Sequence, residues 1–335
     1  MTEIYDFRPF EDHYSSWEST FSSGQGTGEF SFYPGKQPDI YGATDMVFNR
    51  FILGQLEHNS QNPVNQAWAE HIHNFQNPRT GWYKNRYNLT HFREHTAAYA
   101  CASLVLLGFL PKYPIRKAMK ISQSPESMEK WLNTVPWSMI WPGSHIVSGL
   151  PAILHMTGEG TEEFFHWYFD WLDSTASPET GYWSRGLAHK MGLVSPRRKQ
   201  EMGGAFHMYY VYEARKRTWK YNEAIVDATL ALQHANGLWD KNVPYCIDLD
   251  GVYCLLRSSR NAGGYKKDEV FQTCCRFLST AAAVLNDSQS LYRLYHNSHK
   301  LPGALAAIAE CSVHYPDLVK TTVPWRQSLD YACFI

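Results

Sequence analysis

Apolar residues recur along much of the chain at the spacing of an α-helix. Such spacing places them on one face of a helix, where they can pack against other elements while the opposite face meets water. The best example runs through Val270, Phe271, Cys274, Phe277, Leu278, Ala281 and Leu285. Similar amphipathic segments are expected at 63–76, 115–133, 164–172 and 220–233. Strand-like alternation is scarce, so the pattern predicts an all-α protein.

A second kind of segment lies between these amphipathic helices. Each begins near a polar residue and continues into a run rich in Ala, Gly and Leu, as in EHTAAYACASLVLLG and NSHKLPGALAAIAEC. The polar residues recur at intervals of 43 to 62 residues and are Asp45, His95, His145, His207, Asp250 and His299. Each interval is interpreted as one helical hairpin. Six hairpins that close on themselves predict a single (α/α)6 toroid over residues 41–335, with the small-residue helices as its inner ring.

Three turns between hairpins repeat a glycine followed by an aromatic residue. Glycine readily adopts the left-handed conformation that ends a helix. The segment Gln233–Trp239 reads Q-x3-G-x-W and resembles the core of the QW repeat of squalene-cyclase and prenyltransferase-type toroids. The copy at Gln76–Trp82 has one more residue between Gln and Gly, and the copy ending at Trp183 has Ala176 in place of Gln. Six-hairpin glycosidases, sugar epimerases and polysaccharide lyases share this architecture, so the resemblance implies a toroid and leaves the family open.

The first forty residues fall outside the repeat. They mix aromatic residues with Ser and Gly and are too aromatic for a plain linker. We expect this arm at 1–40 to lie across one face of the toroid, to cover its cavity, or to contact a partner subunit. An oligomer is compatible with any of these arrangements.

Composition narrows the class of partner. The chain has 335 residues with 15% aromatic residues, which is too much apolar mass for a disordered chain. A net charge of −1 argues against nucleic acid and anionic membranes as partners. No apolar run reaches the roughly 20 residues of a membrane-spanning helix. The acidic N-terminus lacks the features of a signal peptide, so we expect a cytoplasmic protein.

Closure of the toroid would bring the polar residues together around one pocket. Asp250 is the candidate catalytic acid with Asp248 orienting it, because Asp248-Leu-Asp250-Gly251 resembles the D-x-D-D acid motif of class II terpene cyclases, with Gly251 in place of the final Asp. His207 and His95 are candidate bases or hydrogen-bond donors. The remaining candidates for substrate binding are His145, His299, Asp45, Trp183, Trp239, Tyr210 and Tyr253. Helix capping is the structural alternative for the Asp residues.

Several functions fit this set. The first is cyclisation, isomerisation or a related pericyclic reaction of a hydrophobic, terpenoid-like small molecule in an aromatic cavity. The second is carbohydrate chemistry, with Trp residues stacking on sugars and His or Asp pairs acting as acid and base. A non-enzymatic helical-repeat binding protein is the third. The basic segment at 184–204 is either a lid or a solvated loop.

Metal binding was weighed against these functions. Cys246 with His207 or His299 offers ligands for zinc. His91 and His95 have the i, i+4 spacing of a helical ligand pair, but no third ligand follows them in sequence. The sequence therefore predicts neither a metal nor a cofactor.

Overall fold

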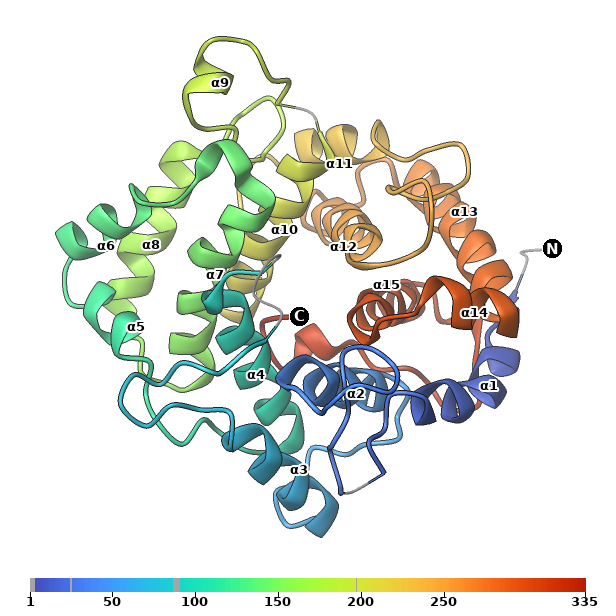
Figure 1. Cartoon of the computed structure of the whole chain (residues 1–335). Coiled ribbons are helices and arrows are strands. Elements are labelled where there is room, and N and C mark those ends of the chain that lie inside the picture. Colours follow the sequence, from blue (N-terminus) through green and yellow to red (C-terminus); the bar gives the residue numbers. More distant parts are fainter. Residues whose placement is uncertain (1–3, 25, 87–90, 197) are drawn as a thin grey trace.

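The computed structural model describes residues 4–24, 26–86, 91–196 and 198–335 and is almost entirely helical (Figure 1). The prediction of an all-α protein is confirmed. Within the described residues the only sheet is a pair of two-residue strands, β1 (Tyr5–Asp6) and β2 (Val319–Lys320), which run parallel. This short sheet joins the two ends of the chain.

Six helices contact one another in a closed sequence around the centre of the molecule (Figure 1). Each helix contacts the next along the chain, and the last contacts the first. In order, they are α2 (Ile40–Ile52), α4 (Arg93–Leu107), α7 (Ile140–Met156), α10 (Lys199–Ala214), α12 (Cys246–Asn261) and α15 (Leu301–His314).

Small residues allow these six helices to approach closely. An added Cβ at Gly303 of α15 would lie 2.6 Å from the Cα of Cys246 on α12. An added Cβ at Gly149 of α7 would lie 3.0 Å from the carbonyl oxygen of Glu94 on α4. Such contacts exclude a larger side chain, because the neighbouring atoms belong to the backbone and cannot rotate away. The Ala- and Gly-rich runs therefore follow from close packing between inner helices.

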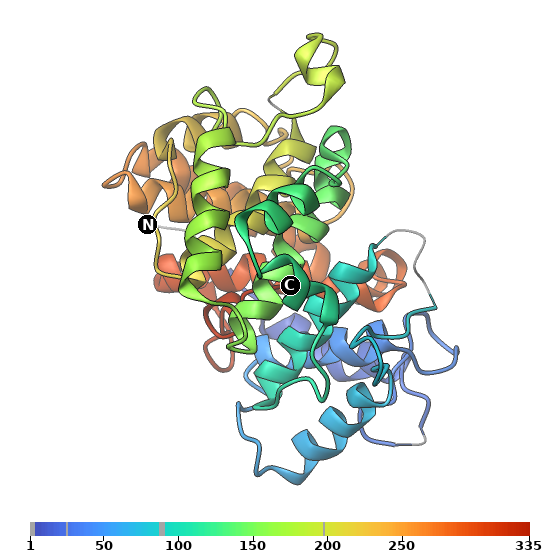
Figure 2. The same cartoon turned by 90° about the vertical axis from the view of Figure 1, so that its left-hand side faces the viewer.

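The remaining helices lie outside this inner group (Figures 1 and 2). They are α1 (Arg8–Ser19), α3 (Pro63–His73), α5 (Arg116–Ile121), α6 (Pro125–Leu132), α8 (Glu162–Thr175), α9 (Leu187–Lys190), α11 (Asn222–Leu230), α13 (Lys267–Leu285) and α14 (Ser288–Leu294). Short 3-10 turns occur at Trp137–Met139, Ser298–Lys300, Pro316–Leu318 and Ser328–Asp330.

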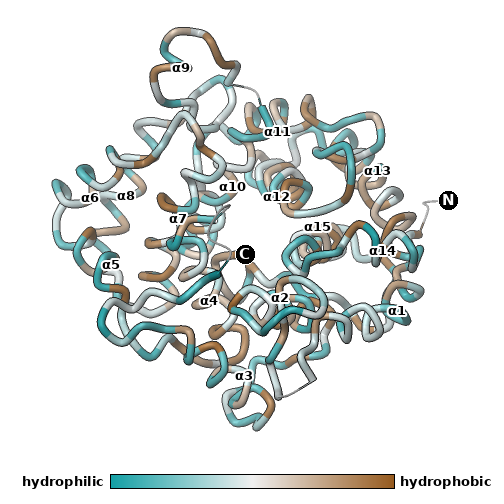
Figure 3. Tube along the Cα trace, viewed as in Figure 1, coloured by the Kyte–Doolittle hydropathy of each residue, from teal (hydrophilic) through white to brown (hydrophobic). Residues whose placement is uncertain are grey.

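The outer helices are amphipathic, and hydrophilic and hydrophobic positions alternate along them (Figure 3). In α13 the buried face contains Val270, Cys274, Phe277, Leu278, Ala281 and Leu285, as the periodicity predicted. The segment 115–133 differs from the prediction of one continuous helix. It forms α5 and α6, because Pro125 cannot donate a backbone hydrogen bond and the Ser124 hydroxyl caps the new helix at the amide of Ser127.

Most inner helices begin earlier than the sequence pattern indicated, whereas α15 begins after His299. Asp39, rather than Asp45, caps α2, and its carboxylate accepts hydrogen bonds from the amides of Tyr41 and Gly42. Asp45 therefore lies inside α2, one turn beyond the start of the helix. His145 and His207 likewise lie within α7 and α10. Burial of these polar residues along the helix, rather than at its end, requires specific side-chain partners.

The glycine turns have the expected left-handed backbone. Gly81, Gly181 and Gly237 have φ values of +80°, +71° and +83°. The side-chain amide of Gln233 donates to the carbonyl of Gly237 at 2.8 Å and to that of Thr273 on α13 at 3.0 Å. Gln76 makes the equivalent bond to Gly81 at 2.9 Å. The Gln of each motif therefore ties its turn together, and Gln233 also ties the turn to the next outer helix.

Much of the arm at 1–40 packs onto the helices. Phe10, Tyr14 and Trp17 of α1 are buried, and the Trp17 indole donates to the carbonyl of Tyr295 at 3.1 Å. The loop after α1 brings Phe32 and Tyr33 to the central cavity. By contrast, the segment around α9 projects outward from the body (Figures 1 and 2). None of the described helices combines the length and apolar character needed to cross a membrane.

Candidate active site

A cavity of about 650 Å³ lies among the inner helices. Its wall brings together five of the six polar positions that recur along the sequence: His95, His145, His207, Asp250 and His299. A further histidine, His91, also lines it. The rest of the wall is mainly aromatic and aliphatic, with two cationic residues, Arg86 and Lys300.

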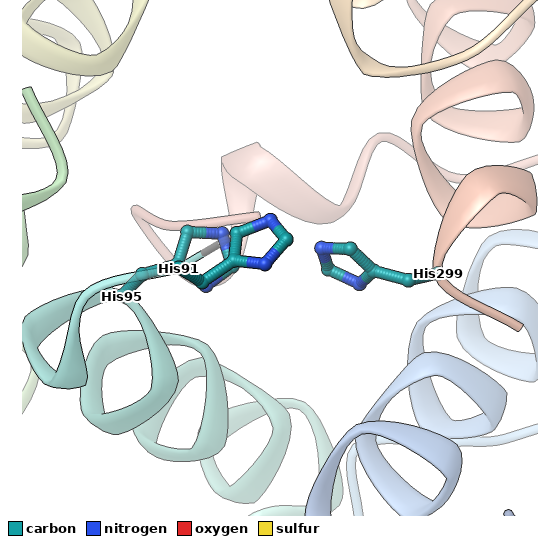
Figure 4. A group of neighbouring side chains, drawn as sticks. All are labelled: His91, His95 and His299. Carbon is teal, nitrogen blue, oxygen red and sulfur yellow. The ribbon is translucent and has the colours of Figure 1, made fainter. Parts of the chain in front are cut away.

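The five histidines form a continuous cluster. The ring centroids of His91 and His95 lie 4.5 Å apart, and those of His95 and His145 also lie 4.5 Å apart. His207 extends the cluster, with its ring centroid 5.0 Å from that of His145. The ring of His299 approaches from the opposite side and faces His91 and His95 (Figure 4).

Three of these rings are held through Nδ1 by residues outside the cavity wall. Nδ1 of His95 lies 2.7 Å from the Tyr41 hydroxyl, Nδ1 of His299 lies 2.8 Å from Oδ1 of Asp45, and Nδ1 of His207 lies 2.9 Å from Oγ of Ser144. With Nδ1 occupied in this way, the chemically available nitrogen of each ring is Nε2.

The tautomer of His207 follows from its partner. The Ser144 hydroxyl donates its single hydrogen to the carbonyl of Trp141 at 2.5 Å. Its oxygen is then an acceptor for His207, so Nδ1 of His207 carries the proton and Nε2 has a free lone pair. Burial lowers the pKa of His207 to about 3, against an opposing backbone hydrogen bond to Gly203. His207 is therefore a neutral imidazole at neutral pH.

Burial also depresses the pKa of the neighbouring rings. It lowers the pKa of His91 to about 3, and the nearby imidazoles of His299 and His207 contribute in the same direction. The pKa values of His95 and His145 lie well below the usual range for the same reason, since an imidazolium would lose its hydration there. The cavity thus presents neutral nitrogen bases rather than a cluster of positive charges.

Asp250 is the unusual acidic group of the cavity. Its side chain is about 1% exposed, and neither carboxyl oxygen has a hydrogen-bond partner among the described residues. Burial raises the pKa of Asp250 well above its usual range, and the nearby carboxyl of Asp248 adds to the increase. A carboxyl group in this setting is kept protonated and can donate a proton to a bound molecule.

Glycine at position 203 makes room for this carboxyl group. A Cβ added there would lie 2.6 Å from Oδ2 of Asp250 and 2.9 Å from Cδ1 of Trp141. Because the same residue hydrogen-bonds His207 through its backbone, Gly203 lies next to both the acidic and the basic group.

Asp248 does not orient Asp250 through a hydrogen bond in this structure. Its two carboxyl oxygens accept from the amides of Trp239 at 2.8 Å and Tyr245 at 3.0 Å, and the latter bond closes a capping box at the start of α12. Burial raises the pKa of Asp248 to about 7, although these amides favour the ionised form. Asp248 thus caps helix α12, which is the alternative to a catalytic role that the sequence analysis gave for the Asp residues.

Asp45 lies behind the cavity wall rather than in it. It is fully buried and accepts hydrogen bonds from the Tyr99 hydroxyl at 2.9 Å, the Ser298 hydroxyl at 2.5 Å and the His299 ring. Its link to the cavity is therefore indirect and runs through His299.

The four aromatic residues expected to shape the cavity stand one layer further out. Trp183 donates to the carbonyl of Leu172, and Trp239, which borders a separate hollow near Lys199, donates to that of Thr229. Tyr210 contacts the His207 ring, and Tyr253 packs edge-on against Phe206, which is itself part of the wall. None of the four lines the cavity, so direct contact with a substrate is not available to them in this conformation.

The sequence pattern did not single out several residues of the wall. Phe32 and Tyr33 come from the N-terminal arm, Trp141 from the first turn of α7, and Ile335 from the end of the chain. The periodic signal could not reveal them, because they lie outside the repeated polar positions. Trp141 lies four residues before His145, and this spacing would have placed both on the same face of a helix.

No protein-family model, no curated protein and no solved structure gives a significant match to the chain. A function must therefore be inferred from the cavity and its side chains.

Proposed function

We propose that the chain is an (α/α)6 toroid enzyme that isomerises or cyclises a small, largely apolar molecule by proton transfer within its central cavity. Asp250 acts as the general acid, and Nε2 of His207 as the general base. We expect its substrates to be molecules whose carbon skeletons rearrange through proton addition and removal, such as terpenoid-like alkenes or enones.

The observation that carries this proposal is the unpartnered carboxyl of Asp250. Leaving a buried polar group without a hydrogen bond costs roughly 1–3 kcal/mol, so such a group calls for a reason beyond folding. A bound molecule with a basic oxygen or a polarisable double bond would accept its proton. Burial, together with the nearby carboxyl of Asp248, raises the pKa of Asp250 and favours the protonated form, which is the form that an acid catalyst needs.

His207 supplies the complementary group. Its Nδ1 proton is held by Ser144, and its Nε2 lone pair is available for a proton from the substrate. Because Gly203 adjoins both His207 and Asp250, one molecule in the cavity can meet acid and base together. Transfer of that proton from His207 back to Asp250 through solvent would restore both groups and complete the cycle without any net redox change.

The lining favours an apolar substrate over a carbohydrate. The volume of about 650 Å³ falls within the range of small-molecule sites, and Phe32, Trp141, Phe206, Leu249 and Ile335 supply apolar surface. Trp183 and Trp239, the residues expected to stack on sugars, are buried elsewhere. Arg86 and Lys300 would suit a carboxylate or another polar end of the molecule, so terpenoid or polycyclic acids are the first compounds to test.

Solvent deuterium tests the proposal directly. The protein is incubated in D2O with terpenoid and polycyclic acids and, in parallel, with mono- and oligosaccharides, after a thermal-shift screen has selected the compounds that bind. A ligand at 100 times its dissociation constant adds about 2.7 kcal/mol of stability. We expect deuterium incorporation or a changed skeleton in an apolar ligand and loss of both in Asp250→Asn. Binding of sugars alone, or unchanged deuterium incorporation in Asp250→Asn, would contradict the proposal.

A further inference from the structure

A second chemical feature of the cavity lies apart from Asp250 and His207. His91, His95 and His299 each place a ring nitrogen so that all three atoms lie within 4.8 Å of one another. Figure 4 shows His91 and His95 on one side and His299 on the other, with the rings pointing toward a common centre. His95 is in α4 and His299 is in the 3-10 turn before α15, so the group joins distant parts of the chain.

We propose that these three imidazoles bind a divalent first-row transition ion, with zinc as the reference metal. Three histidines are a recognised ligand set for zinc, and they leave a fourth position for water or substrate. A tetrahedral ion with Zn–N bonds of about 2.1 Å holds its ligand atoms about 3.4 Å apart. The three ring nitrogens, at most 4.8 Å apart, therefore need to approach one another by no more than about 1.4 Å, which small rotations of the side chains can supply.

The surroundings of the rings support this assignment independently. A metal-binding histidine typically donates its second ring N–H to a carboxylate or another fixed acceptor, which orients the ring. The buried carboxylate of Asp45 takes this place at 2.8 Å from Nδ1 of His299, and the Tyr41 hydroxyl lies 2.7 Å from Nδ1 of His95. Tyr99 and Ser298 in turn hold Asp45. Two of the three ligands thus have Nε2 left for the ion and a second layer of hydrogen bonds behind them.

Two features of the surroundings bear on a cation at this position. The fully buried carboxyl of Asp45 lies behind His299 and contacts its ring. Arg86 and Lys300 also line the cavity, so a divalent ion would favour an anionic or strongly oxygen-donating ligand at its open position. A metal in such a place polarises a carbonyl or carboxylate oxygen of a bound molecule. It would therefore anchor the polar end of an otherwise apolar substrate.

Metal content of the purified chain tests this inference without any activity assay. The protein is stripped with a chelator, dialysed against Zn²⁺ and analysed for bound zinc, and the Zn²⁺ affinity is measured by competition with a chromophoric chelator. We expect one equivalent in the wild type and at least a 100-fold weaker affinity in His299→Ala and in His91→Ala. Asp45→Asn should weaken zinc binding by about 10- to 100-fold through its effect on His299.

Matched variants distinguish zinc binding at this site from nonspecific zinc binding by other histidines. His207→Ala removes a histidine from the same cavity, and His166→Ala removes an exposed one, and both should retain one equivalent of zinc with unchanged affinity. Equal zinc binding by His299→Ala and the wild type would overturn the assignment. If His299→Ala does not fold, X-ray absorption of the zinc-loaded wild type tests the site instead. Three imidazole ligands on the zinc would support the site, and fewer would reject it.

The metal site and the proton-transfer proposal can fail separately. Asp250→Asn should bind zinc like the wild type while losing deuterium incorporation. A protein that binds no zinc but exchanges deuterium would reject only the metal site.

Discussion

Asp45 and His299 are 254 residues apart in the chain, and their side chains meet at 2.8 Å. A carboxylate can only accept in this bond, so Nδ1 of His299 carries the proton and Nε2 faces the cavity with a lone pair. The contact joins α2 to the turn before α15, where the last inner helix meets the first. One hydrogen bond thus links the contact between the first and last inner helices to a residue of the cavity wall.

The two aspartates at the start of α12 should respond in opposite ways to substitution. Asp250→Asn is expected to reduce turnover by about 10²- to 10⁴-fold, as for loss of a general acid, and to leave the melting temperature equal or higher. Asp248→Asn disturbs two backbone hydrogen bonds and is expected to cost about 1–2 kcal/mol of stability. Thermal unfolding and the deuterium assay measure both effects. A large loss of stability in Asp250→Asn would indicate a structural role instead.

Neighbouring glycines in α10 offer a steric test of the acid. Gly203→Ala would place a methyl group 2.6 Å from Oδ2 of Asp250, and we expect it to displace the carboxyl and to abolish most of the activity. Gly204→Ala is the matched control, because its methyl group would lie 2.6 Å from Cγ1 of Ile140 and would not meet Asp250. Both variants should lose stability. Equal activity in the two would show that the position of Asp250 does not matter.

The pH dependence of activity follows from the same two groups. In the proposed mechanism Asp250 acts while protonated, and its pKa is raised by burial and by Asp248, so kcat/KM should fall on the alkaline side as Asp250 ionises. On the acid side His207 loses its lone pair only near its pKa of about 3. Removing a negative charge with Asp248→Asn should lower the pKa of Asp250 and move the alkaline limb to lower pH. An alkaline limb that stays in place would contradict the assignment of Asp250.

The pH dependence of stability provides a check that needs no substrate. The pKa of His207 is about 3 in the folded protein and about 6.5 when unfolded. Between these values the unfolded state binds a proton that the folded state does not. The contribution of His207 is therefore complete above pH 6.5 and is lost as the pH falls toward 3, with a slope of about 1.4 kcal/mol per pH unit. His207→Gln should remove that slope in urea unfolding measured from pH 6 to 4.

Asp248 should change stability with pH in the opposite direction to His207. Its pKa is about 7 in the folded protein against an ordinary value of 3.8 for an exposed Asp, so between these values the folded state holds the extra proton. Its contribution is complete below pH 3.8 and is lost as the pH rises through 7. With Asp248 present, the free energy of unfolding should fall as the pH rises through that range, and Asp248→Asn should remove this fall. His207→Gln should instead remove a rise. Parallel changes in the two variants would refute this pair of assignments.

A buried ion pair away from the cavity should dominate the stability of the α12–α15 contact. Nε and Nη2 of Arg257 donate to the two carboxyl oxygens of Glu310 at 2.5 and 2.9 Å, and both residues are buried. Arg257→Met leaves the Glu310 charge without its partner and is expected to cost about 3–5 kcal/mol. The double variant with Glu310→Met should recover most of this loss. Substitution of the exposed Arg8 beside Asp6 should leave stability nearly unchanged, because solvent screens an exposed ion pair.

The sequence by itself determined the local features of this protein. The helical stripe from Val270 to Leu285 and the left-handed glycines at 81, 181 and 237 appear in the structure as predicted. Periodicity and backbone preference are properties of neighbouring residues, and a single sequence carries them. The recurrence of polar positions also identified five residues that line the cavity, because each repeat contributes one polar residue from an inner helix or from the turn before it.

Only the tertiary structure decided what those residues can do. Asp248 and Asp250 look alike in sequence, but one caps a helix and the other faces the cavity without a partner. His91 and His95 gain a third nitrogen neighbour from His299, more than 200 residues away. Hydrogen-bond partners, burial and the pKa values that depend on them arise from contacts between distant segments. Such contacts exist only once the helices have packed against one another, so no local pattern encodes them.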